Sequence, residues 1–384
     1  MAKTATMAAP LCGLPEEIVV WEILVRLAPN DLIRCRVVCH AWRRVTSARN
    51  FLLAHHSRQP SLYLLYGFDY GTVHPQNILA FDHQAATAAQ LHTAARLKED
   101  YYITASCDGM LILSGYGMTG TICCNPVTRQ HTPLRVAPDL KILGMYPHRP
   151  TGEYRVLLQQ RWYINMCKAQ IGLYVFALGT EQPPRYIIGW RETSSAFLNT
   201  PALVRDSLHW YPVDHHSDNN PLSYPTESKP LIMVFDPIVE SFRRMRAPIV
   251  PNRSYIFEMD DTLGIYSHNS DTETVDIWVL RNYEGEVWDL KYKIKLPIAE
   301  IRQHFEGRDD YCHVAVVPVD GRVLLLVSLL RCVHHIDSDG KLVNSFHHGG
   351  GILRACAYRL KQTLVPHTFF TSLKGYVVND SPFI

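Results

Sequence analysis

The sequence lacks the features that mark secreted and membrane proteins. No uninterrupted apolar run reaches the roughly 18 residues that a membrane-spanning helix needs. The first residues, MAKTATMAAPLCG, contain no apolar core of a signal peptide. The ten cysteines are scattered and include no Cys-x-x-Cys pair, so a disulfide framework is not expected. We expect an intracellular protein with reduced thiols, located in the cytoplasm, the nucleus or both.

Charge of one sign is not in excess either. The chain has 38 Lys and Arg against 36 Asp and Glu, a net charge of +2, which gives no reason to expect a nucleic acid or a membrane as a partner. Hydrophobic residues at 47% and charged residues at 19% indicate a folded chain. Its 384 residues have room for a small unit followed by one large domain or two ordinary ones.

Signatures of catalysis and cofactor binding are also missing. There is no GxSxG elbow, Walker loop or HExxH helix. Residues 115–120 fit GxGxxG, but a strand and a turn follow instead of the helix that a dinucleotide site requires, so a hairpin loop is predicted. We expect no catalytic residues and no cofactor.

A metal site is considered in one loop region and not favoured. Its candidate ligands are His209, Asp214, His215, His216 and Asp218. A zinc site needs three or four converging ligands, whereas adjacent histidines on a strand point to opposite faces. A solvated loop is the better interpretation, and no metal is expected.

What the chain does contain is a compact helical stretch from Leu14 to Phe51. Pro15 can open a helix, and at ~100° per residue the first helix places two apolar sets on different sides. One set is Val20, Ile23, Leu24 and Leu27, and the other is Ile18, Trp21 and Val25. Glu22 and Arg26 form a favourable i,i+4 pair. Pro29 then interrupts the chain, Asp31 can cap a second helix, and Val38, Cys39, Trp42 and Val45 line a third.

Three short helices cannot hide all these apolar faces from one another. The surplus either packs on the rest of this chain or forms a surface for a partner. Seven arginines between residues 26 and 58 surround the stretch with only Asp31 as a nearby acid, which favours an acidic protein partner.

The order Leu14-Pro15, Ile18, Ile23-Leu24, Arg26-Leu27, Pro29, Asp31-Leu32, Val38-Cys39, Trp42-Arg43 and Phe51 resembles an F-box. Ala28 and His40 are mild departures from that pattern. The resemblance implies docking to a Skp-family adaptor and, through it, to a cullin–RING ubiquitin ligase. The residues it marks as adaptor contacts are Leu14, Pro15, Ile18, Leu24, Leu32, Val38, Cys39 and Trp42. Some of these must hold the bundle together instead, and the sequence does not separate the two groups.

From residue 61 onward the chain changes to short β-like runs separated by Gly, Pro, Asn and Asp. Helical candidates are confined to residues 85–97 and 298–305. An acidic turn recurs in CDGMLIL, RDSLHWY, DDTLGIY and VDGRVLLLV, alternating with apolar strands that end in polar turns. Five or six antiparallel units of roughly 40 to 60 residues are expected. A β-propeller is the preferred arrangement because closure protects every sheet edge, and a large sandwich is the alternative.

The same phrases, with CNPVTRQ, LYVF, IMVFDPIVESF and LVPHTFF, resemble the F-box-associated domains of plant proteins. The expected fold class is α+β and multidomain: a small three-helix F-box followed by a mostly antiparallel, all-β, propeller-like domain. We expect a flexible N-terminus at 1–10, the bundle at 11–55 and the β domain at 61–380.

The polar insertion at 209–230 is the longest between two strand signals, and long loops on rigid scaffolds often carry specificity. Trp210, Tyr211, His215 and Tyr224 are the candidate substrate contacts. The expected function is a non-catalytic subunit of a Skp–cullin–F-box ligase that binds a protein substrate. The alternatives are an F-box scaffold or inhibitor without ubiquitin transfer, and a glycan- or ligand-binding propeller.

Overall fold

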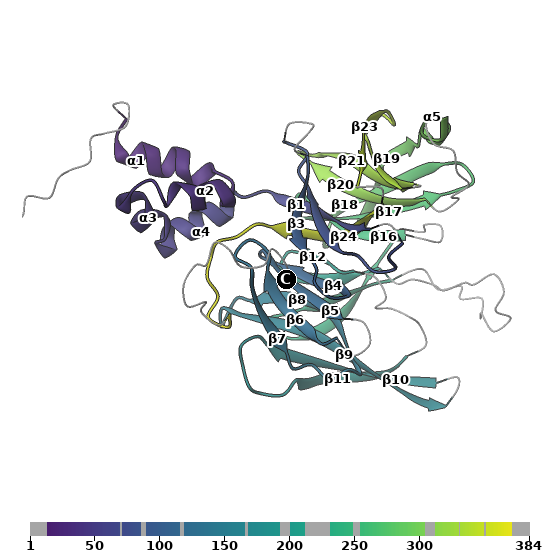
Figure 1. The fold of residues 1–384 in the computed structure, drawn as a ribbon. Coiled ribbons are helices and arrows are strands. Elements are labelled where there is room, and N and C mark those ends of the chain that lie inside the picture. Colours follow the sequence, from purple (N-terminus) through teal and green to yellow (C-terminus); the bar gives the residue numbers. More distant parts are fainter. Residues whose placement is uncertain are drawn as a thin grey trace, which may run out of the picture.

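A small helical bundle precedes a ring of six antiparallel sheets (Figure 1). The structure is a computed structural model. It describes residues 14–69, 71–85, 90–115, 119–165, 168–192, 200–211, 231–248, 254–303, 312–329, 331–348 and 351–370. None of the helices in these ranges combines the length and the apolar character that crossing a bilayer requires.

The bundle begins with one irregular helix. Its segments are α1 (Glu16–Ile18), the π-helical η2 (Val19–Ile23) and the 3₁₀ η3 (Leu24–Arg26). The amide of Leu24 donates to the carbonyl of Val19, five residues back, so residues 20 and 25 share a face. Val20, Leu24 and Val25 are buried while Ile23 is exposed, so the expected grouping of Val25 and Ile23 is wrong. The expected pair of Arg26 with Glu22 is present at 2.7 Å.

Three further helices complete the bundle: α2 (Pro29–Cys35), α3 (His40–Thr46) and α4 (Arg49–Arg58). Asp31 does not cap α2, because the helix already begins at Pro29; its carboxylate accepts from Arg34 instead, at 3.0 Å. The helical landmarks of the sequence end at Phe51, and α4 continues past them to Arg58. Phe51, Leu52 and His55 are buried along it, and this packing supports the extra turn.

Each sheet of the ring has four strands, which we call a blade. Blade 1 contains β1 (Ser61–Phe68), β2 (Asn77–Phe81), β3 (Leu91–Arg96) and β24 (Ile352–Lys361), and blade 2 contains β4 (Tyr101–Cys107), β5 (Met110–Gly115), β6 (Thr121–Asn125) and β7 (Gln130–Leu134). Blade 3 contains β8 (Leu140–His148), β9 (Glu153–Asn165), β10 (Lys168–Ala177) and β11 (Arg185–Glu192), and blade 4 contains β12 (Ala202–Val204), β13 (Ser207–Trp210), β14 (Leu231–Asp236) and β15 (Ser241–Arg246). Blade 5 contains β16 (Ser254–Met259), β17 (Thr262–Asn269), β18 (Thr274–Asn282) and β19 (Val287–Lys295), and blade 6 contains β20 (His313–Val319), β21 (Arg322–Leu329), β22 (Cys332–Ile336) and β23 (Leu342–His347).

The ring is closed by strands from opposite ends of the chain. β24 pairs antiparallel with β1, with Ser61 opposite Lys361 and Phe68 opposite Ile352. β24 also contacts β4 and β20, the first strands of the two neighbouring blades. The fold is therefore the expected β-propeller, with six blades and no unpaired edge at the closure.

The recurring acidic phrases form the first hairpin turn in four blades. Both central residues have positive φ in each: Asp108 and Gly109 at 46° and 83°, Arg205 and Asp206 at 48° and 60°, Asp260 and Asp261 at 49° and 59°, and Asp320 and Gly321 at 45° and 76°. Two successive positive φ angles define the tight hairpin turn for which Asp and Gly are preferred. The repeat expected from the sequence is confirmed at these turns.

One helical candidate is wrong and one is confirmed. Leu91–Arg96 is strand β3, in which Ala95 packs into the core between blades 1 and 2. The alanines there permit a helix, but pairing with β2 and burial decide for a strand. The second candidate is helix α5 (Ile298–Gln303), whose Ile298 and Ile301 are buried against blades 5 and 6.

Candidate partner-binding surfaces

Exposed apolar side chains are concentrated on the bundle. Among the described residues, seven of the sixteen large hydrophobic side chains that are exposed lie between residues 14 and 58: Leu14, Ile18, Trp21, Ile23, Val37, Val38 and Leu53. Val37 and Val38, in the turn between α2 and α3, are 86% and 62% exposed. An apolar surface of this density on so small a unit is typical of a protein interface.

The structure separates the predicted adaptor contacts into three groups. Leu14, Pro15, Ile18 and Val38 are exposed, whereas Leu24 and Leu32 lie in the bundle core with Phe51. Cys39 and Trp42 are partly buried, and the Cys39 sulfur caps α3 by accepting from the Trp42 amide at 3.4 Å. The exposed group offers the most surface to a partner and the two core residues offer none; adaptor contact by any of the eight stays a prediction.

Some of the arginines between residues 26 and 58 have partners within the bundle. Arg26 pairs with Glu22, Arg34 pairs with Asp31, and Arg36 donates to the carbonyl of Thr46. In the described part of the chain, no salt bridge joins the exposed side chains of Arg43, Arg44 and Arg49 to a carboxylate. These three leave a net positive charge next to the apolar surface, which favours an acidic partner.

Other apolar side chains of the bundle pack against residues of the propeller and of the segment that follows it. The core of the bundle includes Leu364, with Val365 and Val127 packed against it, so the segment after β24 lies between the bundle and blade 2. We call residues 362–370 the C-terminal strap. Thr363 is buried, and its carbonyl accepts from the Asn125 side chain at 3.1 Å.

An electrostatic contact also joins the bundle to the propeller. His56 of α4 lies 3.9 Å from Asp108 in the first hairpin of blade 2, and the Tyr154 hydroxyl donates to the same carboxylate at 3.0 Å. Burial alone would raise the pKa of Asp108, but His56 and Tyr154 hold it below its ordinary value. The carboxylate is therefore ionised at neutral pH.

Trp210 and Tyr211, expected to contact substrate, lie in the interior of the propeller. Trp210 is fully buried in the core between blades 3 and 4, and Tyr211 packs into the core between blades 4 and 5. Aromatic side chains at the end of β13 fill the space between sheets and offer no surface to a substrate, so the assignment of these two is corrected. His215 and Tyr224 lie outside the described residues.

The structure describes His209 among the candidate metal ligands and both ends of the glycine-rich segment 115–120. His209 is buried, with Nε2 2.8 Å from the Tyr283 hydroxyl and Nδ1 3.0 Å from the carbonyl of Ser207, and burial lowers its pKa to about 4. No three metal-ligating side chains converge within the described ranges, and 214–218 lie outside them. The Gly115 amide donates to the Gly120 carbonyl at 3.0 Å and β6 follows directly, which confirms the hairpin loop.

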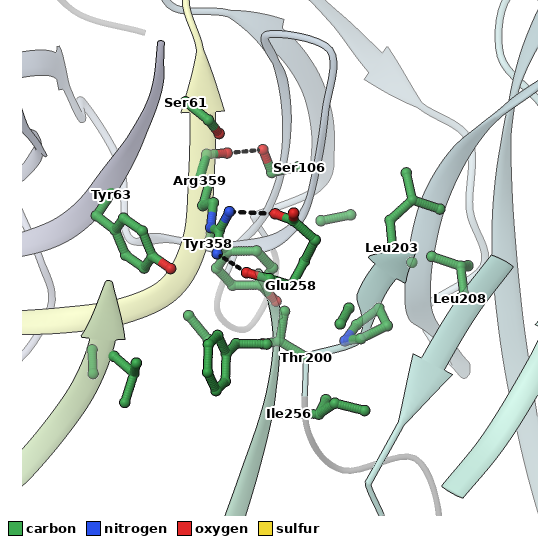
Figure 2. A pocket seen from close by; sticks show the side chains of 18 of the residues that line it. Ser61, Tyr63, Ser106, Thr200, Leu203, Leu208, Ile256, Glu258, Tyr358 and Arg359 are labelled. Atoms are coloured by element: carbon green, nitrogen blue, oxygen red, sulfur yellow. Dashed lines mark hydrogen bonds and ion pairs between the residues drawn. The ribbon is translucent and has the colours of Figure 1, made fainter. Parts of the chain in front are cut away.

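A cavity of about 190 Å³ lies near the propeller axis, among strands of all six blades (Figure 2). Arg359 of β24 spans it, with Nη1 2.5 Å from the carboxylate of Glu258 and Cζ 4.7 Å from the centre of the Tyr63 ring. Burial would lower the pKa of Arg359, but Tyr63 and Glu258 raise it, and the pKa of buried Tyr63 rises to about 12. The guanidinium is held between groups from blades 1 and 5, so this arrangement stabilises the ring closure.

No sequence signal pointed to this cavity. Tyr63, Glu258 and Arg359 are separated by about a hundred residues or more and come from different strands. Only closure of the ring brings them together.

Among solved structures, the similar ones include a nidogen/laminin complex, with 11% identity and a TM-score of 0.44, covering 77% of this chain and 96% of that one. Apo AztD from Citrobacter koseri has 8% identity and a TM-score of 0.39, covering 77% and 98%. The Malassezia sympodialis allergen Mala s 1 has 9% identity and a TM-score of 0.36, covering 65% and 78%. These likenesses are too distant to carry an argument, and no curated protein matches the chain.

Two family models match the chain. An F-box-like domain matches residues 11–58, which contain the helical bundle. An F-box associated beta propeller domain matches residues 74–332, about two thirds of the chain, and these residues include most of the ring. The chain is therefore a member of the family of F-box proteins with an F-box-associated β-propeller domain.

Proposed function

We propose that this protein is the substrate-recognition subunit of a Skp–cullin–F-box ubiquitin ligase. The bundle docks on a Skp-family adaptor and the propeller binds a protein substrate. The observation that carries this proposal is the concentration of exposed apolar side chains on an F-box-like bundle. These side chains stay exposed although the bundle has a core of its own and the C-terminal strap packs against that core.

The protein itself contributes no chemical step in this proposal. It acts by proximity, because holding the substrate near a ubiquitin-charged conjugating enzyme raises the effective concentration of the acceptor lysine. The strap and the His56–Asp108 contact support this role, since they fix the bundle against blade 2 and so limit the positions that a bound substrate can take.

Co-purification with a Skp adaptor and a cullin tests the proposal. The wild type is compared with the double variant Leu14→Ala/Pro15→Ala, which changes exposed residues at the start of the bundle. A matched control is Leu290→Ala/Val343→Ala, which truncates exposed side chains on blades 5 and 6. We expect adaptor and cullin with the wild type and the control, and neither with the bundle variant. A folded wild type that retains no adaptor would refute the proposal.

A further inference from the structure

The chain enters and leaves the propeller at the same end of blade 1. β1 begins at Ser61, shortly after the bundle ends at Arg58, and β24 ends at Lys361, which pairs with Ser61. Because the two strands are antiparallel, the bundle before β1 and the C-terminal strap after β24 lie next to each other (Figure 1). The Lys361 ammonium also donates to the Ser57 carbonyl of α4, at 3.4 Å. Ring closure therefore brings the last described segment of the chain against the first.

Blade 2 fixes the beginning of the strap. The Thr363 carbonyl accepts from the Asn125 side-chain amide at 3.1 Å, and the Thr363 hydroxyl accepts from the Val365 amide at 3.1 Å. Thr363 and Asn125 are both fully buried. In the first hairpin of blade 2, a Cβ on Gly109 would stand 2.5 Å from the Thr363 methyl group. The strap thus fits closely on blade 2 at this point.

The next residue of the strap belongs to the core of the bundle. Leu364 is 5% exposed and packs with Leu24, Leu32 and Phe51. Val365 packs against the same core. Neighbouring residues of the strap therefore have different partners: Thr363 is anchored on the propeller, and Leu364 is buried in the bundle.

A unit as small as the bundle depends on each buried side chain. In the described part of the chain, its core consists of seven buried hydrophobic residues, six from the bundle itself and Leu364 from the strap. So short a unit buries too little apolar surface for a large margin of stability. Truncating a buried leucine costs a free energy comparable with the whole stability of a unit of this size. We therefore expect the bundle to open far more often without Leu364.

The far end of the strap has a separate attachment. Phe370 is 4% exposed and lies in the core between blades 2 and 3, with Phe369 packed against it. Leu364 is thus held between two points of attachment to the propeller, Thr363 and Phe370. Both attachments require assembled blades, because residues of other strands form the sites that receive them.

We propose that the C-terminal strap is a required part of the F-box bundle, so that the bundle keeps its docking conformation only after the propeller ring has closed. The strap supplies Leu364 to the bundle once β24 has paired with β1 and Thr363 has reached blade 2. Adaptor binding near one end of the chain thereby reports that the substrate-binding domain has been completed near the other. This inference names a regulation of the proposed adaptor site and rests on the proposed function, but the dependence of the bundle on the strap is measurable without an adaptor.

Hydrogen exchange of the full-length protein, followed by mass spectrometry, tests this dependence. Leu364→Ala removes the side chain from the bundle core, and Leu364→Met nearly keeps its volume. Asn125→Asp removes the donor to the Thr363 carbonyl and retains the oxygen that accepts from the backbone amides two and three residues later. The matched control is Leu325→Ala, which truncates a fully buried leucine in the core between blades 5 and 6.

We expect exchange in residues 16–58 to be about tenfold or more faster in Leu364→Ala and Asn125→Asp than in the wild type, with blade 5 unchanged. Leu364→Met and Leu325→Ala should keep exchange in the bundle within about twofold of wild type. Unchanged bundle exchange in Leu364→Ala, or equally faster exchange throughout the chain, would overturn the inference. Faster bundle exchange in Leu364→Ala alone would also overturn it, because the strap would then keep its place without the bond to blade 2.

Affinity for a purified Skp-family adaptor separates this inference from the proposed function. Leu364 and Asn125 are buried, so about tenfold weaker adaptor binding by their variants reports a change in the bundle and not a lost contact. Wild-type affinity in Leu364→Ala, despite faster bundle exchange, would overturn the inference and keep the ligase role. A wild type that binds no adaptor would refute the proposed function, and the exchange rates would still decide whether the bundle needs the strap.

Discussion

The imidazole of His56, in the last turns of α4, lies 3.9 Å from the carboxylate of Asp108, in the first hairpin of blade 2. This contact and the C-terminal strap connect a helical unit to a β unit that the chain joins by only two residues between Arg58 and Ser61. In the proposed role this relationship matters, because a bundle held against the ring would present a substrate on the propeller at a defined place.

Removing the charge of Asp108 should loosen this junction without unfolding the protein. Asp108→Asn keeps a residue that tolerates the positive φ of the turn. Because the carboxylate is partly exposed, we expect a loss below ~1 kcal/mol in unfolding free energy. Hydrogen exchange should become faster in residues 56–61 and stay unchanged in blade 5. Unaltered exchange at the junction would show that the strap alone holds the bundle.

Two glycines in equivalent turns should respond differently to a methyl group. Gly109 has φ of 83°, and a Cβ there would lie 2.4 Å from the Lys361 carbonyl, whereas Gly321 has φ of 76° and its nearest neighbour is 4.0 Å away. Gly321→Ala should cost ~1 kcal/mol, the conformational penalty alone. Gly109→Ala should cost more, because β24 must also shift. Denaturant midpoints measure both, and equal losses would contradict this explanation.

The structure predicts which bundle substitutions separate adaptor binding from folding. Leu24 is 2% exposed and Ile18 is 42% exposed on the same irregular helix. Leu24→Ala should lower the unfolding free energy by about 2–5 kcal/mol. Ile18→Ala should leave the melting temperature nearly unchanged and still weaken adaptor capture. Normal capture by folded Ile18→Ala would remove Ile18 from the adaptor contacts.

Two tryptophans of different exposure test the interior position of Trp210. Trp210→Ala removes a fully buried ring and should destabilise the protein by about 3–5 kcal/mol. Trp162→Ala removes a ring on β9 that is 39% exposed and should have a much smaller effect on thermal unfolding. Similar melting temperatures for the two variants would mean that the interior position of Trp210 is wrong.

Buried histidines should make the protein less stable in mild acid. Burial lowers the pKa of His209, His334 and His367 to about 4 each. In the unfolded chain these groups take up a proton near pH ~6.5, so the unfolded state binds more protons than the native state between those values. Stability therefore falls as the pH decreases from 6.5 towards 4, by at most ~2 kcal/mol per histidine at pH 5.

Denaturant unfolding between pH 7.5 and pH 5 measures this dependence. His209→Gln should reduce its slope, because one of the three groups no longer titrates. A flat stability profile in the wild type would show that these histidines take up protons as readily in the native state as in the unfolded chain.

Local features of the chain were sufficient to predict much of the fold. Asp108-Gly109 and Asp320-Gly321 predict tight hairpins because few other residues adopt two successive positive φ angles. The landmarks from Leu14 to Phe51 identify the F-box, and Glu22 and Arg26 pair as their spacing requires. Each of these depends only on neighbours along the chain.

Tertiary structure decided the rest, because burial and convergence depend on residues that are distant in sequence. The π-helical turn at Val19–Ile23 exposed Ile23 and buried Val25, against the regular helical period. The packing of blade 4 between its neighbours placed Trp210 in the interior, although the same residue at a strand end could have faced a substrate. Ring closure joined Arg359 to Glu258. Such pairings are fixed only when strands from both ends of the chain meet, since no local preference specifies which surface another strand will cover.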